Sequence, residues 1–378
     1  MRNIVVSNLI NFRLLNRSRD VADVNIQGEE MKVIARIREP SDDEPDQWVS
    51  GPFFERVIQE TKLLEEAGFD AIATTESSHD PFVGAMLAAE HSKRAEIWTH
   101  IAVAFARNPM NVAYLAHDLQ AFSQGRFVLG IGSQVQAHVV KRFSMPWSSP
   151  AARMKEFVLA LRAIWDCWNN GTRLEFRGEF YSHTLMTPVF MPPPNPSGPP
   201  PIMMGAVGPK MTEVAAEVAD GIIGHSFASA DYMREVSLPV IEKTLAAHGR
   251  SRADFQIVHP PFVVAVDDEA ELKRRTEMMR EHVAFYGSTP AYLGVLEFHG
   301  WGDLHPELNK MSKEGRWKEM ANLIDDEMLH TFAIIGKPEH AVEEIKRRFT
   351  GVVDAVSIRL PQTTEPAVSE LVRRLKAA

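Results

Sequence analysis

Apolar residues in this chain occur in short, nearly continuous runs, and each run is followed by a longer segment with helical spacing of its apolar positions. Met31–Ile37 (MKVIARI) is such a run, and runs of this kind are typical of strands buried on both faces. In the segment Phe53–Ala67 the apolar residues lie on one helical face, and Gly68 stands where a helix ends. The pattern therefore predicts an α/β protein in which strands and helices alternate.

Eight strand-plus-helix units can be counted along the chain. The predicted strands are MKVIARI, FDAIATTE, AEIWTHIAVAFA, RFVLGIG, IMMGAVGP, DGIIGHSF, FQIVHPPFVVAV and VDAVSIRL. Eight parallel units fit a closed (β/α)8 TIM barrel better than an open doubly wound sheet. The proline-rich stretch MPPPNPSGPPP and the mixed helical and loop region 285–335 are interpreted as insertions between units.

No composition shift marks a domain linker, so residues 31–378 are predicted to form a single TIM-barrel domain. Residues 1–30 have no place in the barrel count. Two interpretations stay open for them: a disordered N-terminal extension, or an upstream start that is not the native one, with Met31 as the alternative first residue.

The amino-acid composition limits the kinds of molecule that the protein is expected to bind. The chain has 378 residues, is 45% apolar and 24% charged, and carries a net charge of −9, which argues against nucleic-acid and anionic-membrane binding. No apolar run approaches the roughly 18 residues of a membrane span, and the start does not resemble a secretory signal. The single cysteine, Cys167, cannot form an internal disulfide and lies among apolar helix positions. We expect a cytoplasmic protein that acts on a small molecule.

Candidate chemistry is expected at the carboxyl ends of the strands, where TIM barrels place their active sites. His79 and His225 follow strands directly and are the better functional histidines. A catalytic metal is not expected, because an early H-x-H, an HExxH motif, a cysteine cluster and an aspartate at the end of the last strand are all missing. The residues that follow the predicted strands are Glu76–Asp80, Phe105–Asn108, Gly132–Gln134, Gly205–Lys210, His225–Ser226 and His259–Pro260.

Two glycine turns are candidates for binding a phosphate. The stretch GRFVLGIGSQV has Gly130 and Gly132 in the spacing of a dinucleotide fingerprint, but Val135 takes the place of the third glycine. The turn from Gly205 to Lys210 is the better site, because glycine N–H groups, a following helix N-terminus and a lysine could all contact an anion. A tight turn that merely needs glycine stays open as the alternative.

Three blocks of the sequence resemble the luciferase-like monooxygenase superfamily. They are GFDAIATTESSHDPF, AVAFARNPMNVAYLAHDLQAFSQGRFVLGIGSQV and PPPIMMGAVGPKMTEVAAEVADGIIGH. Within the superfamily the chain is most similar to the coenzyme F420-dependent oxidoreductases, and the resemblance extends from about Lys32 to Leu360. It implies an oxidoreductase that transfers a hydride between C5 of a deazaflavin and a small organic substrate. It also implies a homodimer or a higher homo-oligomer.

The resemblance implies a set of site residues. A non-prolyl cis peptide in the third strand, assigned to His100–Ile101, would lie under the deazaflavin ring. Glu76 matches an acidic position at the ring edge, and Ser133 matches a small hydroxylated residue near the cofactor tail. Ala206, Val207 and Gly208 match backbone that holds the phosphate.

The chain departs from one subgroup of that family. Sugar-phosphate dehydrogenases carry a histidine directly after the strand 2 acid and a glutamate after strand 4, where this chain has Ser77 and Val135. His79 is the candidate that could replace the histidine as a proton donor or acceptor, with His138 as a weaker one.

Three alternative functions stay open beside the F420-dependent one. An FMN-dependent monooxygenase that uses reduced flavin and O2 shares the scaffold. A non-catalytic flavin-binding protein would explain the missing acid and histidine. A metal-dependent barrel hydrolase comes last, since no metal motif supports it.

Overall fold

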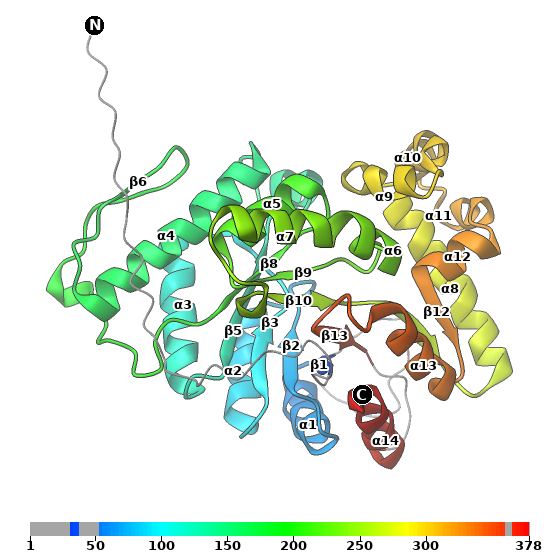
Figure 1. Cartoon of the computed structure of the whole chain (residues 1–378), viewed down its shortest axis with the longest axis horizontal. Helices are drawn as coiled ribbons and strands as arrows, with labels where there is room; N and C mark the ends of the chain where they lie inside the picture. Colours follow the sequence, from blue (N-terminus) through cyan, green and yellow to red (C-terminus); the bar gives the residue numbers. More distant parts are fainter. Residues whose placement is uncertain (1–30, 38–52, 360–364, 378) are drawn as a thin grey trace, which may run out of the picture.

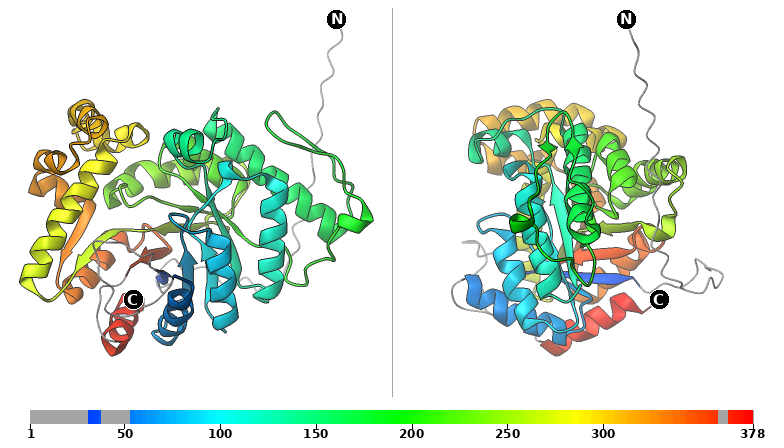
Figure 2. Two further views of the ribbon diagram at one scale, coloured as in Figure 1. Left: turned by 180° about the vertical axis from the view of Figure 1, so that it is seen from behind. Right: turned by 90° about the vertical axis from the view of Figure 1, so that its left-hand side faces the viewer.

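The computed structural model describes residues 31–37, 53–359 and 365–377 (Figure 1). The proposed N-terminal extension 1–30 lies outside these residues. In the described part, parallel strands form the centre of the molecule and helices surround them (Figure 2).

Eight parallel strands close into a barrel, as the sequence predicts for a (β/α)8 TIM barrel. Neighbouring strands pair in the order β3-β2-β1-β13-β10-β9-β8-β5, and β3 also pairs with β5, which closes the ring. Short β4 (Ala102–Val103) continues beside β5 after β3 ends. The barrel strands are β1 (Lys32–Arg36), β2 (Ala71–Thr74), β3 (Glu96–Thr99), β5 (Phe127–Gly132), β8 (Ile202–Gly205), β9 (Gly221–Ile223), β10 (Gln256–His259) and β13 (Ala355–Ile358).

The barrel interior is filled by side chains at every second strand position. Ile34 points inward with Trp98 and Met203, whereas Val33 and Ala35 on the same strand pack outward with the helices. Successive strand residues point to opposite faces, so both faces of each strand are apolar. This explains why the strands appear as continuous apolar runs in the sequence.

Helices pack against the outside of the barrel, and several begin at a residue that caps them. Asp80 accepts a hydrogen bond from the Phe82 N–H, and Asn108 accepts one from the Asn111 N–H. Both caps precede a proline, which suits the first helical position. The surrounding helices are α1 (Phe53–Glu66), α2 (Pro81–His91), α3 (Pro109–Phe122), α4 (Pro150–Asn170), α5 (Pro209–Val218), α6 (Ala230–Tyr232), α7 (Leu238–Ala247), α8 (Glu269–Gly287), α13 (Pro338–Phe349) and α14 (Glu365–Lys376).

Two insertions lie at opposite ends of the molecule in Figure 1. A small hairpin of β6 (Phe176–Arg177) and β7 (Ser182–His183) precedes the proline-rich stretch. A group of helices follows α8 and stands on the far side of the barrel from that hairpin (Figure 2). These helices are α9 (Leu293–Phe298), α10 (His305–Lys313), α11 (Trp317–Met320) and α12 (Asp326–Phe332).

One part of the predicted seventh unit is wrong. The run FQIVHPPFVVAV is not a single strand, because Pro260 and Pro261 lack the N–H groups that a continuous ladder needs. Its first half is β10, but its second half, β11 (Phe262–Ala265), leaves the barrel sheet. There it pairs with β12 (Ala333–Gly336), a strand inside the region that we expected to be helix and loop. So short an apolar run cannot be told from a helical segment by periodicity.

No helix in the described part of the chain is long and apolar enough to cross a membrane. Cys167 is a buried free thiol in α4.

Candidate active site

The carboxyl ends of β3, β5 and β8 lie together at one end of the barrel, which we call the barrel mouth. The peptide bond between His100 and Ile101 is cis, at the position that the resemblance assigns. The Ile101 side chain lies against two glycines: a Cβ on Gly132 would be 3.2 Å from Ile101 Cδ1, and one on Gly205 would be 3.7 Å from its Cγ2. The structure therefore brings these three strand ends into direct contact, with Ile101 packed against both glycines, and we call these three residues the glycine-lined surface.

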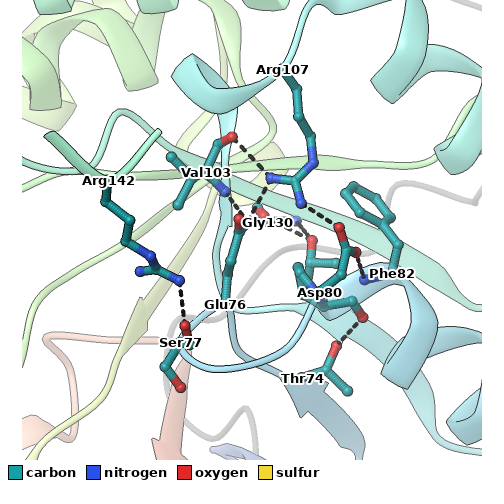
Figure 3. Close-up of polar contacts among 11 residues, drawn as sticks. Thr74, Glu76, Ser77, Asp80, Phe82, Val103, Arg107, Gly130 and Arg142 are labelled. Atoms are coloured by element: carbon teal, nitrogen blue, oxygen red, sulfur yellow. Dashed lines mark hydrogen bonds and ion pairs between the residues drawn. The ribbon is translucent and has the colours of Figure 1, made fainter. Parts of the chain in front are cut away.

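Glu76 is held in a network of polar contacts at the mouth (Figure 3). Its Oε2 accepts hydrogen bonds from the Val103 N–H at 2.7 Å and from Arg107 Nη1 at 2.6 Å. Arg107 also donates from Nη2 to Asp80 Oδ2 at 2.7 Å. Only 6% of the Glu76 side chain and 14% of the Arg107 side chain are exposed.

Electrostatics in this network favour the charged form of Arg107. Burial acts to lower the pKa of Arg107, but its hydrogen bonds and attraction to Glu76 and Asp80 outweigh burial and raise that pKa. The Glu76 carboxylate thus holds Val103, the last residue of β4, and neutralises a largely buried arginine. The partner of Glu76 was missed from the sequence, although Arg107 stands directly after a predicted strand.

His79 lies in the segment between β2 and α2. Its ring stacks on Phe53, the first residue of α1, with ring centroids 3.8 Å apart and planes 7° apart. The side chain is half-buried, so one edge of the ring remains accessible. The structure does not bring His79 into contact with Glu76 through any hydrogen bond among the described residues.

The two predicted glycine turns differ in what they offer a ligand. Ser133 follows Gly132, and its hydroxyl donates to the Gln134 carbonyl at 3.1 Å. At the other turn the Ala206 N–H is used, since it donates to the Ile223 carbonyl at 3.0 Å. The N–H groups of Val207 and Gly208 make no hydrogen bond within the described chain, and α5 begins at the next residue. Those two N–H groups are therefore free to bind a ligand at this turn.

Histidines at the mouth are held neutral. Burial, followed by the charge of Arg36, lowers the pKa of His100 to about 3 and that of His225 to about 4. His225 stacks on Tyr292, with centroids 4.6 Å apart, and its Nδ1 accepts a hydrogen bond from the Phe227 N–H. In the described ranges no group of three or more histidine, cysteine or carboxylate side chains could hold a metal ion.

The sequence interpretation assigned no role to Arg36, Arg359, Tyr286 or Tyr292, which also lie at the mouth. Arg36 ends β1 and Arg359 follows β13, while both tyrosines come from the helical insertion side of the molecule. A signal for Arg36 was present, because it is a charged residue at the carboxyl end of a largely apolar strand.

The chain belongs to the luciferase-like monooxygenase family, whose model matches residues 31–355. It is therefore an enzyme of the luciferase-like oxidoreductase and monooxygenase type. It is 53% identical over 301 residues to a Mycobacterium tuberculosis protein described only as uncharacterized, which covers 80% of this chain and 88% of the relative.

Two further similarities are to reductases. The chain is 29% identical over 291 residues to a 5,10-methylenetetrahydromethanopterin reductase of Archaeoglobus fulgidus, covering 75% of this chain and 83% of that protein. The fold matches the coenzyme F420-dependent tetrahydromethanopterin reductase of Methanopyrus kandleri with a TM-score of 0.72. That match has 19% identity and covers 93% of this chain and 99% of the other, so it shows the fold alone.

Proposed function

We propose that this protein is an F420-dependent oxidoreductase that transfers a hydride between deazaflavin C5 and a small organic substrate. The observation that carries the proposal is the packing of Ile101 directly against Gly132 and Gly205 at the ends of three strands. Because the two glycines let Ile101 approach β5 and β8 closely, these strand ends carry few side-chain atoms, and a flat ring system would fit over them. The similarity to a methylenetetrahydromethanopterin reductase supports a reductase rather than an oxygenase.

The residues present also suit an anionic cofactor tail. The free N–H groups of Val207 and Gly208 precede the N-terminus of α5, where backbone donors favour a phosphate. Ser133, at the neighbouring strand end, would contact the tail or the ring substituents through its hydroxyl. His100 and Ile101 would lie beneath the ring.

When bound, the deazaflavin would supply C5 as the two-electron hydride acceptor or donor. The chain's own part is to position the substrate and to move its proton. For an alcohol substrate, loss of the hydride from carbon must be matched by loss of the hydroxyl proton, and His79 is the candidate base. In the reverse direction the same imidazolium would return that proton. Glu76, held by Arg107 and the Val103 N–H, would present its carboxylate at the ring edge.

Cofactor titration of the purified full chain tests the proposal. Fluorescence with F420 and with FMN, checked by equilibrium dialysis, should show preferential F420 binding at micromolar or lower dissociation constants. Gly132→Ala should weaken F420 binding at least about 10-fold, since a new methyl group would project beside Ile101. Gly294→Ala is the matched control, because a Cβ there meets no atom within 4 Å.

An FMN-dependent monooxygenase is the second candidate, and the description of the matched family favours it. It predicts preferential FMN binding and oxygen consumption when reduced flavin is supplied. Either result would overturn the F420-dependent assignment. If neither cofactor bound, the glycine turns would be structural only.

A further inference from the structure

Two arginines lie at the carboxyl ends of adjacent strands on one side of the barrel mouth: Arg36 ends β1 and Arg359 follows β13. In the parallel pair of β1 and β13, Ala35 lies opposite Ile358, so Arg36 and Arg359 are the next pair in register. Ile34 and Ala355 face the barrel interior. Because side chains alternate along a strand, the arginines belong to the same inward-facing set.

Neither guanidinium has an anionic partner among the residues that the structure describes. Arg36 Nε is buried and makes no hydrogen bond there. The two arginines are close enough for their charges to interact. Burial, followed by repulsion from the Arg359 charge, lowers the pKa of Arg36 to about 9. By contrast, Arg252 at the opposite end of β10 forms two hydrogen bonds with Asp354. Arg359 is exposed and Arg36 is partly buried, so the cost of an unpaired charge falls on Arg36, and a bound anion would offset it.

Further polar atoms near this pair also lack partners. Ser357 lies one inward position before Arg359, is fully buried, and its Oγ makes no hydrogen bond within the described chain. The Nε2 of His100, whose side chain is only 8% exposed, is likewise unpartnered. An arriving oxyanion could therefore accept hydrogen bonds from groups besides the two guanidinium groups.

Aromatic rings line the same side. Tyr286 of α8 packs edge-on against His225 with centroids 4.7 Å apart, and Tyr292 stacks on the same histidine with centroids 4.6 Å apart. Burial raises the pKa of Tyr286, while the charges of Arg36 and Arg359 oppose that rise, so its ring lies near both arginines. This side of the mouth therefore combines apolar aromatic rings with the positive charges of Arg36 and Arg359.

Arg36 and Arg359 lie on strands that are separated from the glycine-lined surface. Counted around the closed sheet, β1 is three strands from β5 and β13 is three strands from β8, so the two pairs lie on opposite sides of the ring. A group held by the arginines would therefore enter the mouth from the side opposite Gly132 and Gly205.

We propose that Arg36 and Arg359 bind the carboxylate or phosphate of an anionic substrate, with Ser357 beneath them and Tyr286 beside them. The substrate class is a small organic acid or phosphate ester whose remaining part packs against the tyrosines. The proposal rests on the proposed function, because it takes the ring to lie on the opposite side of the mouth. The same oxyanion chemistry could also come from the cofactor's own phosphate, and the experiment separates the two sources.

The first measurement uses the full chain without cofactor, with inorganic phosphate and benzoate as probes. Ionic strength is kept constant with sodium chloride, so that general screening does not contribute. At least one probe should raise the melting temperature of the wild-type protein, since a ligand that binds only the folded state stabilises it. Arg36→Gln and Arg359→Gln should each raise the probe's dissociation constant at least about 10-fold.

Lys32→Gln is the matched control, because it removes a positive charge from the other end of the same strand, where Lys32 only approaches Glu96. It should bind the probe as the wild type does. The arginine variants should melt at or above the wild-type temperature without the probe, so lost binding would not reflect misfolding. A wild-type protein that neither probe stabilises, or arginine variants that bind both probes normally, would overturn the proposal.

The second measurement titrates the same variants with F420 and FMN. Affinities within about 3-fold of the wild type support a substrate site. A 10-fold loss of cofactor affinity in Arg36→Gln would assign the arginines to the cofactor phosphate and overturn the substrate class. If neither cofactor binds any form of the protein but the oxyanion still binds through the arginines, the proposed function fails while the anion site stands.

Discussion

Two groups of charged residues at the barrel mouth differ in whether their charges have partners of opposite sign. On one side Glu76, Arg107 and Asp80 form a closed set in which each charged group contacts an opposite one (Figure 3). We call this the paired side. On the other, Arg36 and Arg359 end adjacent strands with no carboxylate bound to them in the described ranges, and we call it the unpaired side.

The difference indicates that the paired charges stabilise the fold, whereas the unpaired charges are suited to binding a ligand. The paired side also fixes backbone, because Glu76 accepts the Val103 N–H, so its charges stabilise the fold in the absence of any ligand. The unpaired side keeps positive charge where burial opposes it, which lowers stability unless a ligand compensates. Proteins commonly lose stability at sites kept for function. Variants on the two sides should therefore change stability in opposite directions.

The largest effect is expected for Glu76→Gln on the paired side. Removing one member of a buried ion pair leaves the other charge uncompensated, and we expect the free energy of unfolding to fall by about 3–5 kcal/mol. Urea denaturation followed by circular dichroism measures it. Asp80→Asn is the control, since Asp80 is 48% exposed and asparagine also caps helices, so it should cost about 1 kcal/mol or less. Equal losses in the two variants would contradict the special role of Glu76.

The opposite sign is expected for Arg36→Met on the unpaired side. Methionine keeps an apolar stem of similar length and removes the unpaired charge, so the free energy of unfolding should rise by about 1–3 kcal/mol. The same denaturation experiment measures this change. A destabilised variant would mean that Arg36 has an anionic partner within the chain, and the two sides would no longer differ.

Acid sensitivity should come from the unpaired side. His225 has a folded-state pKa of about 4, caused by burial and then by Arg36, whereas an unfolded histidine titrates near 6.5. Above pH 6.5 both states are neutral and the histidine has no effect. As the pH falls toward 4 the unfolded state alone binds the proton, so stability is lost by about 1 kcal/mol between pH 7 and 5.5.

His225→Asn should remove that loss, because asparagine does not titrate and its carbonyl oxygen can still accept the Phe227 N–H. Melting temperatures of both proteins between pH 5.5 and 8 measure the difference. If the variant loses stability with falling pH as steeply as the wild type, the titration of His225 does not contribute.

Much of the barrel could be predicted from the sequence, because strands buried on both faces appear as apolar runs. Pro260 and Pro261 could be seen in the sequence, but the break of the strand that they cause was not predicted. No local pattern indicates that β11 pairs with β12 outside the barrel. The cis peptide at His100–Ile101 came from the family resemblance and not from a local pattern.

The site was less predictable because it depends on contacts between distant segments. Glu76 and Arg107 were both seen at strand ends, yet their pairing requires the register of neighbouring strands and the path of two loops. His79 follows a strand directly, but the loop turns its ring onto Phe53. Arg36 and Arg359 become neighbours only because the first and last strands close the barrel.

The smallest effect is expected for Lys32→Gln, at the amino end of the strand that Arg36 ends. Lys32 lies 3.4 Å from Glu96, and both side chains are substantially exposed, so solvent weakens the attraction. Such exposed pairs contribute little, and the free energy of unfolding should change by less than about 0.5 kcal/mol. Denaturation at low and high salt should give the same small difference. If Lys32→Gln instead stabilised the protein as much as Arg36→Met, the gain would come from net charge, and position at the mouth would not matter.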